Sequence, residues 1–214
     1  MDFFDRTAPY YDFFSDLVSF GHYARFLKRA VQILAPQEGE KVLELCSGTG
    51  RAASWIARAV GDEGEVVGMD MATSMVDVAT KRYGTLKSLS FRVGDITKPW
   101  HLQGHFDGIF MAMGLHELPE TEREGVPKRS YLALKERGRM VIADFNPEAS
   151  GGKKDFLVSL FGLIERGNLS YLFFRQEEAL RKAGFAQVKS FPELFGLLQI
   201  TLAQKVISTR ETSG

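Results

Sequence analysis

Apolar side chains recur at helical spacing near the start of the chain. Between residues 21 and 35 they fall three or four positions apart, at Tyr23, Leu27, Ala30 and Leu34. This spacing places them on one face of a helix. Pro36 and Gly39 then interrupt the pattern, as residues of these types do at the end of a helix. We therefore expect an amphipathic helix with a buried face.

Short apolar runs alternate with helical patterns over the next part of the chain. Strand patterns occupy residues 41–45, 65–70, 89–95, 106–114 and 138–145. Helical patterns occupy 51–60 and 74–83, and a short turn followed by a helix is expected within 120–134, where Gly125 and Pro127 interrupt the pattern. Because strands and helices alternate, we expect an α/β fold in which helices cover both faces of a parallel sheet.

The pattern changes after Phe145. Residues 153–174 are predicted to form a helical, apolar insertion, and residues 176–183 a charged helix that ends at Gly184. Two further strand patterns, 186–193 and 196–206, are separated by too few residues for a helix, so they are predicted to pair as an antiparallel hairpin. We expect one domain over 1–214, with an N-terminal helical lid (1–35), a core (36–145), an insertion (146–175) and a closing helix and hairpin (176–214).

Composition narrows the function classes. The 27 basic and 27 acidic residues balance, which disfavours nucleic acid and other polyanions as partners. Cys46 is the sole cysteine, so an internal disulfide and a multi-cysteine zinc site are excluded. The first residues lack the pattern of an export signal, and the apolar run 156–164 is shorter than the roughly 18 to 20 residues of a membrane span. We expect a cytoplasmic protein without a transmembrane segment.

The stretch "VLELCSGTGRAASW", residues 42–55, joins a predicted strand to a predicted helix through two glycines. A phosphate-binding P-loop needs Lys followed by Ser or Thr after its last glycine, whereas Arg51 and Ala52 follow Gly50. The segment 48–53 does fit the G-x-G-x-x-A fingerprint of dinucleotide-binding proteins, with Asp70 about twenty residues further on. The glycines alone therefore leave the cofactor ambiguous.

Three acidic residues separate the alternatives. Glu44, Asp70 and Asp95 lie at or near the carboxyl ends of three predicted strands, where open α/β sheets bind ligands. Glu44 would repel a pyrophosphate but would bind a cationic amino group through a charge-assisted hydrogen bond. Three acids without a phosphate-binding cation favour S-adenosylmethionine, which carries an adenine, a ribose diol and an ammonium group. An NAD(P)-dependent oxidoreductase remains the alternative.

The motifs also resemble a known family. "VLELCSGTG", "GMD", "GDI", "FDGIFMAMG" and "LKERGRMVIADF" occur in an order similar to that of class I S-adenosylmethionine-dependent methyltransferases. The first segment resembles the ubiquinone and menaquinone biosynthesis methyltransferases at Tyr11, Asp12, Asp16, Leu17, Ser19, Phe20 and Gly21. The segment Met113-Gly114-Leu115-His116-Glu117 departs from their Phe-Gly-Leu-Arg-Asn sequence, and the C-terminal region is shorter. The resemblance implies a Rossmann-like fold with a seven-stranded, mostly parallel sheet.

Each candidate cofactor residue has an expected role. Gly48 and Gly50 allow close backbone approach, Ser47 and Thr49 face the methionine portion, Asp70 binds the ribose hydroxyls, Met71 flanks the adenine, and Asp95 with Ile96 binds the adenine. The full set of predicted cofactor-binding residues is Tyr11, Glu44, Cys46, Ser47, Gly48, Thr49, Gly50, Asp70, Met71, Met75, Asp95, Ile96, Ala112 and Met113. As alternatives, Asp70 could cap the next helix and Asp95 the following turn. Cys46 is interpreted as a small apolar residue rather than a nucleophile.

His116 is the predicted catalytic residue. It follows the fourth predicted strand, and a histidine accepts protons near neutral pH. Glu117 could orient it, and a structural histidine is the alternative. His22, His101 and His105 lack metal-ligand spacing, so no metal site is expected.

The apolar insertion at 156–174 favours a hydrophobic acceptor. A helical cap, a homodimer contact and a peripheral membrane contact are its alternatives. The overall prediction is a methyltransferase that uses S-adenosylmethionine and yields S-adenosylhomocysteine. Its expected acceptor is a small hydrophobic or aromatic molecule, most specifically one of quinone biosynthesis. A regulatory cofactor-binding protein without catalysis is a further alternative.

Overall fold

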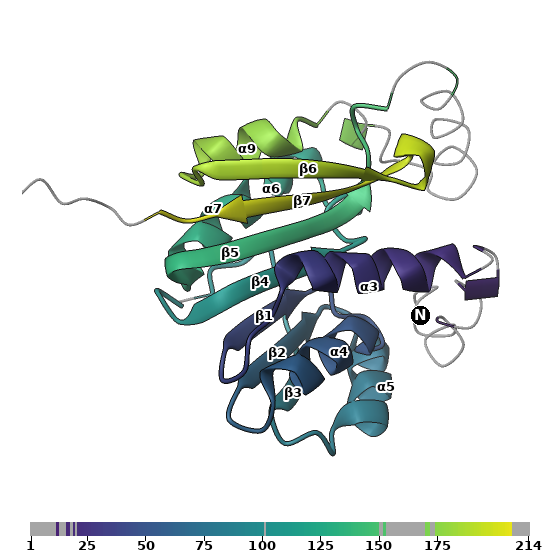
Figure 1. Cartoon of the computed structure of the whole chain (residues 1–214), viewed down its shortest axis with the longest axis vertical. Coiled ribbons are helices and arrows are strands. Elements are labelled where there is room, and N and C mark those ends of the chain that lie inside the picture. Colours follow the sequence, from purple (N-terminus) through teal and green to yellow (C-terminus); the bar gives the residue numbers. More distant parts are fainter. Residues whose placement is uncertain are drawn as a thin grey trace, which may run out of the picture.

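The computed structural model describes residues 12, 16–17, 19, 21–100, 102–149, 152, 170–171 and 174–206. These residues form a seven-stranded sheet with the strand order β3-β2-β1-β4-β5-β7-β6 (Figure 1). The strands are β1 (Lys41–Leu45), β2 (Glu65–Asp70), β3 (Leu89–Val93), β4 (Phe106–Ala112), β5 (Leu134–Phe145), β6 (Gln187–Glu193) and β7 (Leu198–Gln204). Strands β1 to β5 pair in parallel, and β7 pairs antiparallel with both β5 and β6. The predicted α/β fold and its closing hairpin are confirmed.

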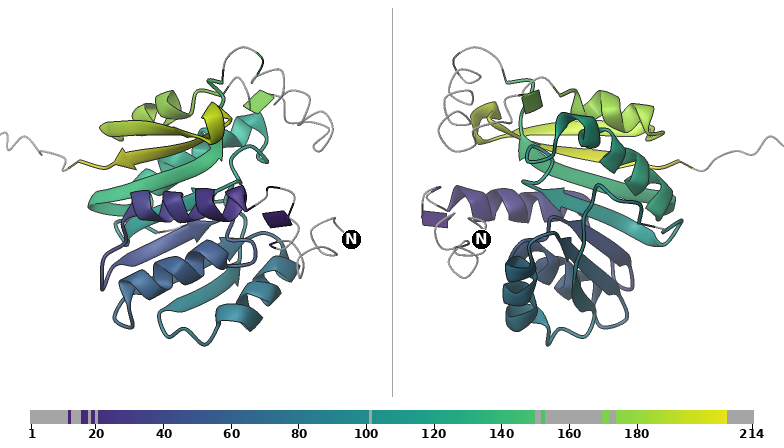
Figure 2. Two further views of the ribbon diagram at one scale, coloured as in Figure 1. Left: turned by 45° about the vertical axis from the view of Figure 1, so that its right-hand side comes forward. Right: turned by 180° about the vertical axis from the view of Figure 1, so that it is seen from behind.

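Helices lie on both faces of this sheet (Figure 2). In chain order they are α3 (His22–Leu34), α4 (Arg51–Val60), α5 (Thr73–Tyr83), α6 (Glu120–Arg123), α7 (Gly125–Ala133) and α9 (Gln176–Lys182). Neighbouring strand residues alternate between two cores. Val42 packs in the core that includes α3 and α4, whereas Leu43 packs in the core that includes α7 and α9. This alternation follows from the two-residue repeat of a strand.

The start of β5 differs most from its predicted position. Strand β5 begins at Leu134 rather than Gly138, and its pairing with β4 shifts register between Phe106 and Gly108. Arg137 within this stretch has a φ of 66°, which is uncommon for a residue other than glycine. Pro127 is tolerated in α7 because it lies in the first turn, where backbone N–H groups have no intrahelical partner.

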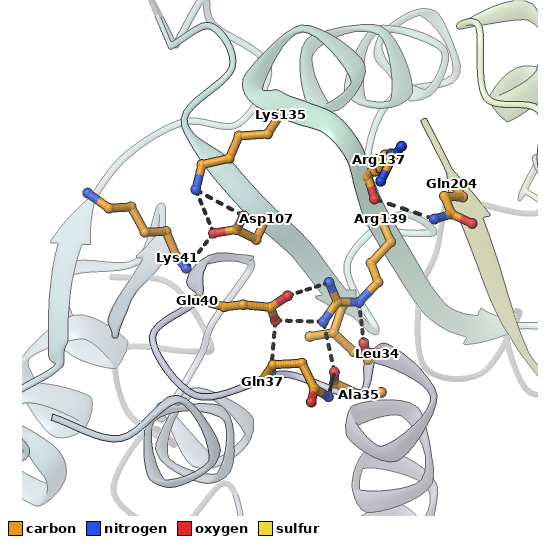
Figure 3. Close-up of polar contacts among 10 residues, drawn as sticks. All are labelled: Leu34, Ala35, Gln37, Glu40, Lys41, Asp107, Lys135, Arg137, Arg139 and Gln204. Carbon is orange, nitrogen blue, oxygen red and sulfur yellow. Dashed lines mark hydrogen bonds and ion pairs between the residues drawn. The ribbon is translucent and has the colours of Figure 1, made fainter. Parts of the chain in front are cut away.

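The amino-terminal side of the sheet is held by a set of paired charges (Figure 3). Arg139 donates to the main-chain oxygens of Leu34 and Ala35 at the end of α3. It also pairs with both carboxylate oxygens of Glu40, at 2.9 and 2.7 Å. Arg139 thereby satisfies carbonyl groups that the helix leaves unpaired and joins α3 to β5.

A second pair lies nearby on the same side. The Lys135 ammonium lies 2.9 and 2.8 Å from the two carboxylate oxygens of Asp107, and the backbone N–H of Lys41 donates to Asp107 at 2.9 Å (Figure 3). These bonds link the beginnings of β1, β4 and β5.

Several sequence predictions fall largely on residues outside the described part. Of the predicted lid, the structure describes residues 12, 16–17, 19 and 21–35, and of residues 153–174 it describes Ser170, Tyr171 and Phe174. The division of the chain into lid, core, insertion and closing segment therefore stays a prediction. Among the described helices, none has both the length and the apolar character that crossing a bilayer requires.

Candidate active site

A cavity of about 530 Å³ opens at the carboxyl ends of β1, β2 and β4. Most of the predicted cofactor residues line it, namely Glu44, Cys46, Ser47, Gly48, Thr49, Asp70, Met71, Met75, Asp95, Ile96, Ala112 and Met113. Gly50 and His116 are not among the described residues of its wall, and Tyr11 lies outside the described residues. The sheet thus brings together residues from four separate loops, as expected at this edge of an open α/β sheet.

The glycine loop after β1 is shaped by close packing. Gly50 has a φ of 79°, and a Cβ atom there would lie 2.5 Å from the ring of Phe91. A side chain at this position is therefore excluded by both backbone conformation and space. The N–H of Ser47 donates to the oxygen of Met69 at 3.0 Å, which ties the loop to β2. Gly50 therefore packs closely against Phe91 and is not among the residues that line the cavity.

Asp70 joins two loops at the cavity wall. One carboxylate oxygen accepts the N–H of Gly48 at 2.7 Å, and the other accepts the N–H of Ala72 at 2.9 Å. Ala72 is the N-cap residue of α5, so the capping alternative is partly realised. Each carboxylate oxygen can accept a further hydrogen bond, and Asp70 lines the cavity. Its predicted role toward ribose hydroxyls is thus sterically compatible with its structural bonds.

Asp95 realises the turn-capping alternative through one of its oxygens, and its adenine-binding role stays a prediction. Its Oδ1 accepts the backbone N–H and the hydroxyl of Thr97, at 2.8 and 2.7 Å. The hydrogen bond from the Thr97 side chain is the main reason why the pKa of Asp95 is lowered. The carboxylate therefore caps the turn through Oδ1. The other oxygen, 3.9 Å from the Lys98 ammonium, is the one available for an adenine amino group.

Glu44 is buried, with 3% of its surface exposed, although it carries a carboxyl group. Burial raises the pKa of Glu44 well above its ordinary value, and the nearby Asp70 contributes to the rise. Among the described residues, its Oε2 atom has no hydrogen-bond partner. A buried polar atom without a partner is costly. A cationic ligand group in the cavity would supply the missing bond, and the ammonium of S-adenosylmethionine fits this requirement.

Cys46 lies in the cavity wall with a neutral thiol. Burial raises the pKa of Cys46 well above its ordinary value, and Asp70, Glu117, Asp144 and Glu44 reinforce the effect. Because the thiolate is the reactive form of cysteine, this environment suppresses nucleophilic reactivity. The finding agrees with the interpretation of Cys46 as a packing residue.

His116 is placed beside the cavity wall rather than in it. Only 3% of His116 is exposed, and its Nδ1 atom lies 2.7 Å from Oδ1 of Asp144 in β5. Gly114 and Glu117, its neighbours in sequence, do line the cavity. The predicted catalytic role of His116 therefore stays a prediction. Asp144 was not singled out from the sequence, because its distance from His116 in the chain hides their contact.

Two cationic side chains lie beside the acidic residues of the cavity. Arg51 and Lys98 both line the cavity. However, Arg51 is paired with Asp16 at 2.9 Å and with Asp12 at 3.5 Å. Its charge is thus matched by protein carboxylates, which leaves the acidic character of the site intact.

Asp12 is a cavity residue that the sequence analysis named only for its resemblance to the family. It accepts the hydroxyl hydrogen of Thr49 at 2.7 Å and pairs with Arg51 and with Arg82. It therefore binds the first segment of the chain to the glycine loop and to α5. The sequence signal that could have indicated an acidic partner such as Asp12 was Arg51, which immediately follows the second glycine of the loop.

The strand order and the reversed β7, with an acidic cavity at the carboxyl edge, define a Rossmann-like methyltransferase fold. Solved structures are similar to it. An S-adenosylmethionine-dependent methyltransferase from Aquifex aeolicus superposes with a TM-score of 0.63 at 21% identity, covering 84% of this chain and 89% of that one. A chain in the complex between the Haloferax volcanii Trm112 methyltransferase activator and a methyltransferase superposes with a TM-score of 0.71 at 18% identity, covering 90% and 93%.

Sequence comparisons identify the family. Residues 42–138 match the model of a methyltransferase domain. The chain is 31% identical over 225 residues to the 2-phytyl-1,4-naphtoquinone methyltransferase of Thermosynechococcus vestitus, covering 94% of this chain and 97% of that protein. It is 34% identical over 147 residues to the demethylmenaquinone methyltransferase of Thermotoga maritima, covering 69% and 62%. The chain belongs to the S-adenosylmethionine-dependent methyltransferases. The methyltransferase prediction is confirmed over the oxidoreductase alternative.

Proposed function

We propose that this methyltransferase acts on a lipophilic aromatic acceptor of the quinol class. The observation that carries the proposal is the 31% identity to a 2-phytyl-1,4-naphtoquinone methyltransferase, which extends over 97% of that protein. The cavity offers supporting chemistry, because Met113, Gly114 and Leu118 line its wall beyond the acidic cofactor residues. These residues provide apolar surface on which an aromatic ring can pack. The expected covering role of residues 156–174 remains part of the proposal.

Three acidic residues bind different groups of the cofactor in this proposal. Glu44 accepts the ammonium group, Asp70 the ribose hydroxyls and Asp95 the adenine amino group, each from a different strand end. S-adenosylmethionine, when bound, supplies a methyl group already activated by the positive charge on its sulfur. The protein must therefore align the acceptor and exclude water rather than form a covalent intermediate.

The reduced acceptor is the form that suits this chemistry. A quinol hydroxyl can lose its proton and pass electron density into the ring, which makes the ring oxygen or carbon nucleophilic. A base beside the acceptor would promote this step. His116 is the candidate base, because it immediately precedes the cavity residue Glu117.

A transfer assay tests the proposal. The purified protein is incubated with S-adenosylmethionine labelled in its methyl group and with 2-phytyl-1,4-naphthoquinone, supplied once reduced and once oxidised. We expect label in the extracted quinol only when the acceptor is reduced. A catechol and a primary amine serve as comparison acceptors. Transfer to the amine but not to the quinol would contradict the proposed acceptor class, and transfer to none of them would favour a regulatory protein.

Calorimetry with the product separates binding from catalysis. S-adenosylhomocysteine is expected to bind, whereas NAD should not, because the acidic cavity repels a pyrophosphate. An Asp107→Asn variant is the matched control. Asp107 lies near the amino end of β4, away from the cavity at the carboxyl ends, and pairs with Lys135. The variant should bind S-adenosylhomocysteine as the unmodified protein does.

A further inference from the structure

A buried pair of ionisable side chains lies directly behind the cavity wall. His116 Nδ1 and Asp144 Oδ1 are 2.7 Å apart, and their side chains are 4% and 1% exposed. The two residues come from different elements, the loop after β4 and the end of β5. Burying such a pair is costly unless the geometry is good and the remaining polar atoms are bonded. A role in the reaction would explain why the chain keeps this costly buried pair.

The surroundings of Asp144 determine which nitrogen of His116 carries hydrogen. Asp144 Oδ2 accepts the backbone N–H groups of Leu115 and His116, at 3.0 and 3.3 Å. Oδ1 accepts the N–H of Phe145 at 2.7 Å in addition to facing Nδ1. The carboxylate is thus surrounded by N–H donors and acts as an acceptor. Nδ1 of His116 must then be the donor, so that Nε2 carries the lone pair in the neutral ring.

A buried cation and a neutral phenol lie beside the pair. Arg123 in α6 is fully buried and donates to the main-chain oxygen of His116 at 3.4 Å. Its positive charge balances that of the Asp144 carboxylate. Burial raises the pKa of Tyr171 well above its ordinary value, so the phenol beside the His116 ring, 6.0 Å between centroids, contributes no charge.

The loop that carries His116 also borders the cofactor cavity. A Cβ atom on Gly114 would lie 2.6 Å from Sγ of Cys46, so the loop carrying His116 packs directly on the cofactor loop. Its other flanking residue, Glu117, lines the cavity. On the far side, the His116 ring packs edge-on against Phe145, with 5.0 Å between centroids. His116 thus lies between the loop that borders the cofactor cavity and Phe145 at the end of β5.

We propose that Asp144 is the positioning residue that presents Nε2 of His116 as the base for an acceptor hydroxyl. The inference rests on the proposed function. In this step the O–H bond of the acceptor breaks, its proton bonds to the Nε2 lone pair, and the electron pair remains on the acceptor oxygen. The Asp144 carboxylate stays ionised and stabilises the imidazolium through Nδ1–H.

An Asp144→Asn variant provides the test. The two backbone N–H groups of Leu115 and His116 favour the amide oxygen at the Oδ2 position over the single N–H of Phe145 at Oδ1. The amide NH₂ then faces Nδ1, and we expect His116 to carry its hydrogen on Nε2. Long-range proton–nitrogen NMR spectra of histidine-labelled protein report this tautomer directly. A His116→Gln variant identifies the His116 signals among the four histidines and leaves the carboxylate of Asp144 in place. Asp107→Asn is the control.

We expect the Nδ1–H tautomer in the unmodified protein and in Asp107→Asn, and the Nε2–H tautomer in Asp144→Asn. In the quinol assay, kcat of Asp144→Asn should fall at least hundredfold with little change in KM, and the ionisation of His116 should vanish from its pH profile. An Nε2–H tautomer in the unmodified protein would overturn the inference, as would an unchanged kcat in Asp144→Asn. If the unmodified protein shows the Nδ1–H tautomer but methylates no quinol, the proposed function fails instead.

Discussion

Charged side chains at the amino ends of the parallel strands differ from Glu44 at the carboxyl ends in whether they have a partner of opposite charge. At the amino ends, Arg139 is matched by Glu40 and Lys135 by Asp107, and the arginine also satisfies the end of α3 (Figure 3). At the carboxyl ends, Glu44 is buried with an unpartnered oxygen among the described residues. Paired charges stabilise the fold, whereas an unpaired buried acid reduces stability until a ligand binds. Arg139 and Lys135 are thus expected to stabilise the sheet, whereas Glu44 is expected to bind the cofactor.

The largest expected effect comes from Asp70→Ala. This change removes an acceptor for the ribose hydroxyls and the bonds to Gly48 and Ala72. Hydrogen bonds to a charged group contribute about 1.5 to 3 kcal/mol each. Affinity for S-adenosylhomocysteine should therefore fall by roughly a hundredfold, measured by calorimetry. An affinity within threefold of the unmodified protein would show that Asp70 serves only to join the two loops.

Arg139→Ala should affect stability and leave the cofactor site unchanged. The variant removes the bonds to Glu40, Leu34 and Ala35. Because the pair is partly exposed, at 18% and 19%, we expect a loss of about 2 kcal/mol in the free energy of unfolding, less than for a fully buried pair. Urea denaturation measures this loss. Weakened binding of S-adenosylhomocysteine by the folded variant would contradict the separation of the two sides.

Glu44→Gln should produce effects of opposite sign on stability and affinity. Replacing a buried carboxyl group that has one unpartnered oxygen among the described residues should stabilise the ligand-free protein. It should also weaken S-adenosylhomocysteine binding by about tenfold, because the amide lacks the charge that attracts the ammonium. Thermal unfolding and calorimetry measure the two effects. A variant that loses both stability and affinity would indicate that Glu44 is mainly structural.

The Glu44 carboxyl also predicts a pH dependence. Since burial raises its pKa in the folded protein, the folded state binds more protons than the unfolded state above pH 4.5. The free energy of unfolding of the ligand-free protein should therefore fall as pH rises from 4.5 through the raised pKa. The stability advantage of Glu44→Gln should grow over the same interval. Urea titrations at several pH values compare the two proteins, and a constant difference would argue against the raised pKa.

Lys135→Met should have the smallest effect. Its ion pair with Asp107 is 41% and 25% exposed, and exposed pairs contribute about 0 to 1 kcal/mol. We expect a loss of roughly 0.5 kcal/mol in the free energy of unfolding and unchanged cofactor binding. A loss as large as that of Arg139→Ala would mean that the two pairs act as one network.

Much of the fold could be predicted from the chain because each element carries its own periodicity. The alternation of Val42 and Leu43 between the two cores is the repeat of a strand, and the helix at His22–Leu34 follows the spacing of its apolar residues. The start of β5 was placed too late because Glu136, Arg137 and Gly138 lack an apolar pattern. Leu134 pairs with Phe106 of β4, and the backbone oxygen of Gly138 accepts the N–H of Lys205, so tertiary contacts extend the strand through this stretch.

The sequence by itself favoured S-adenosylmethionine as the cofactor, because Glu44, Asp70 and Asp95 each lie at or near the end of a recognisable strand, and parallel strands bring their carboxyl ends to one edge. Only the tertiary structure decided which charges are matched. Asp144 reaches His116 across 28 positions of the chain, and Asp12 reaches Thr49 across 37. No local pattern encodes such contacts, since they depend on how strand ends and loops meet in space. The partner of a charged side chain is therefore a property of the fold, whereas its type and strand position are properties of the sequence.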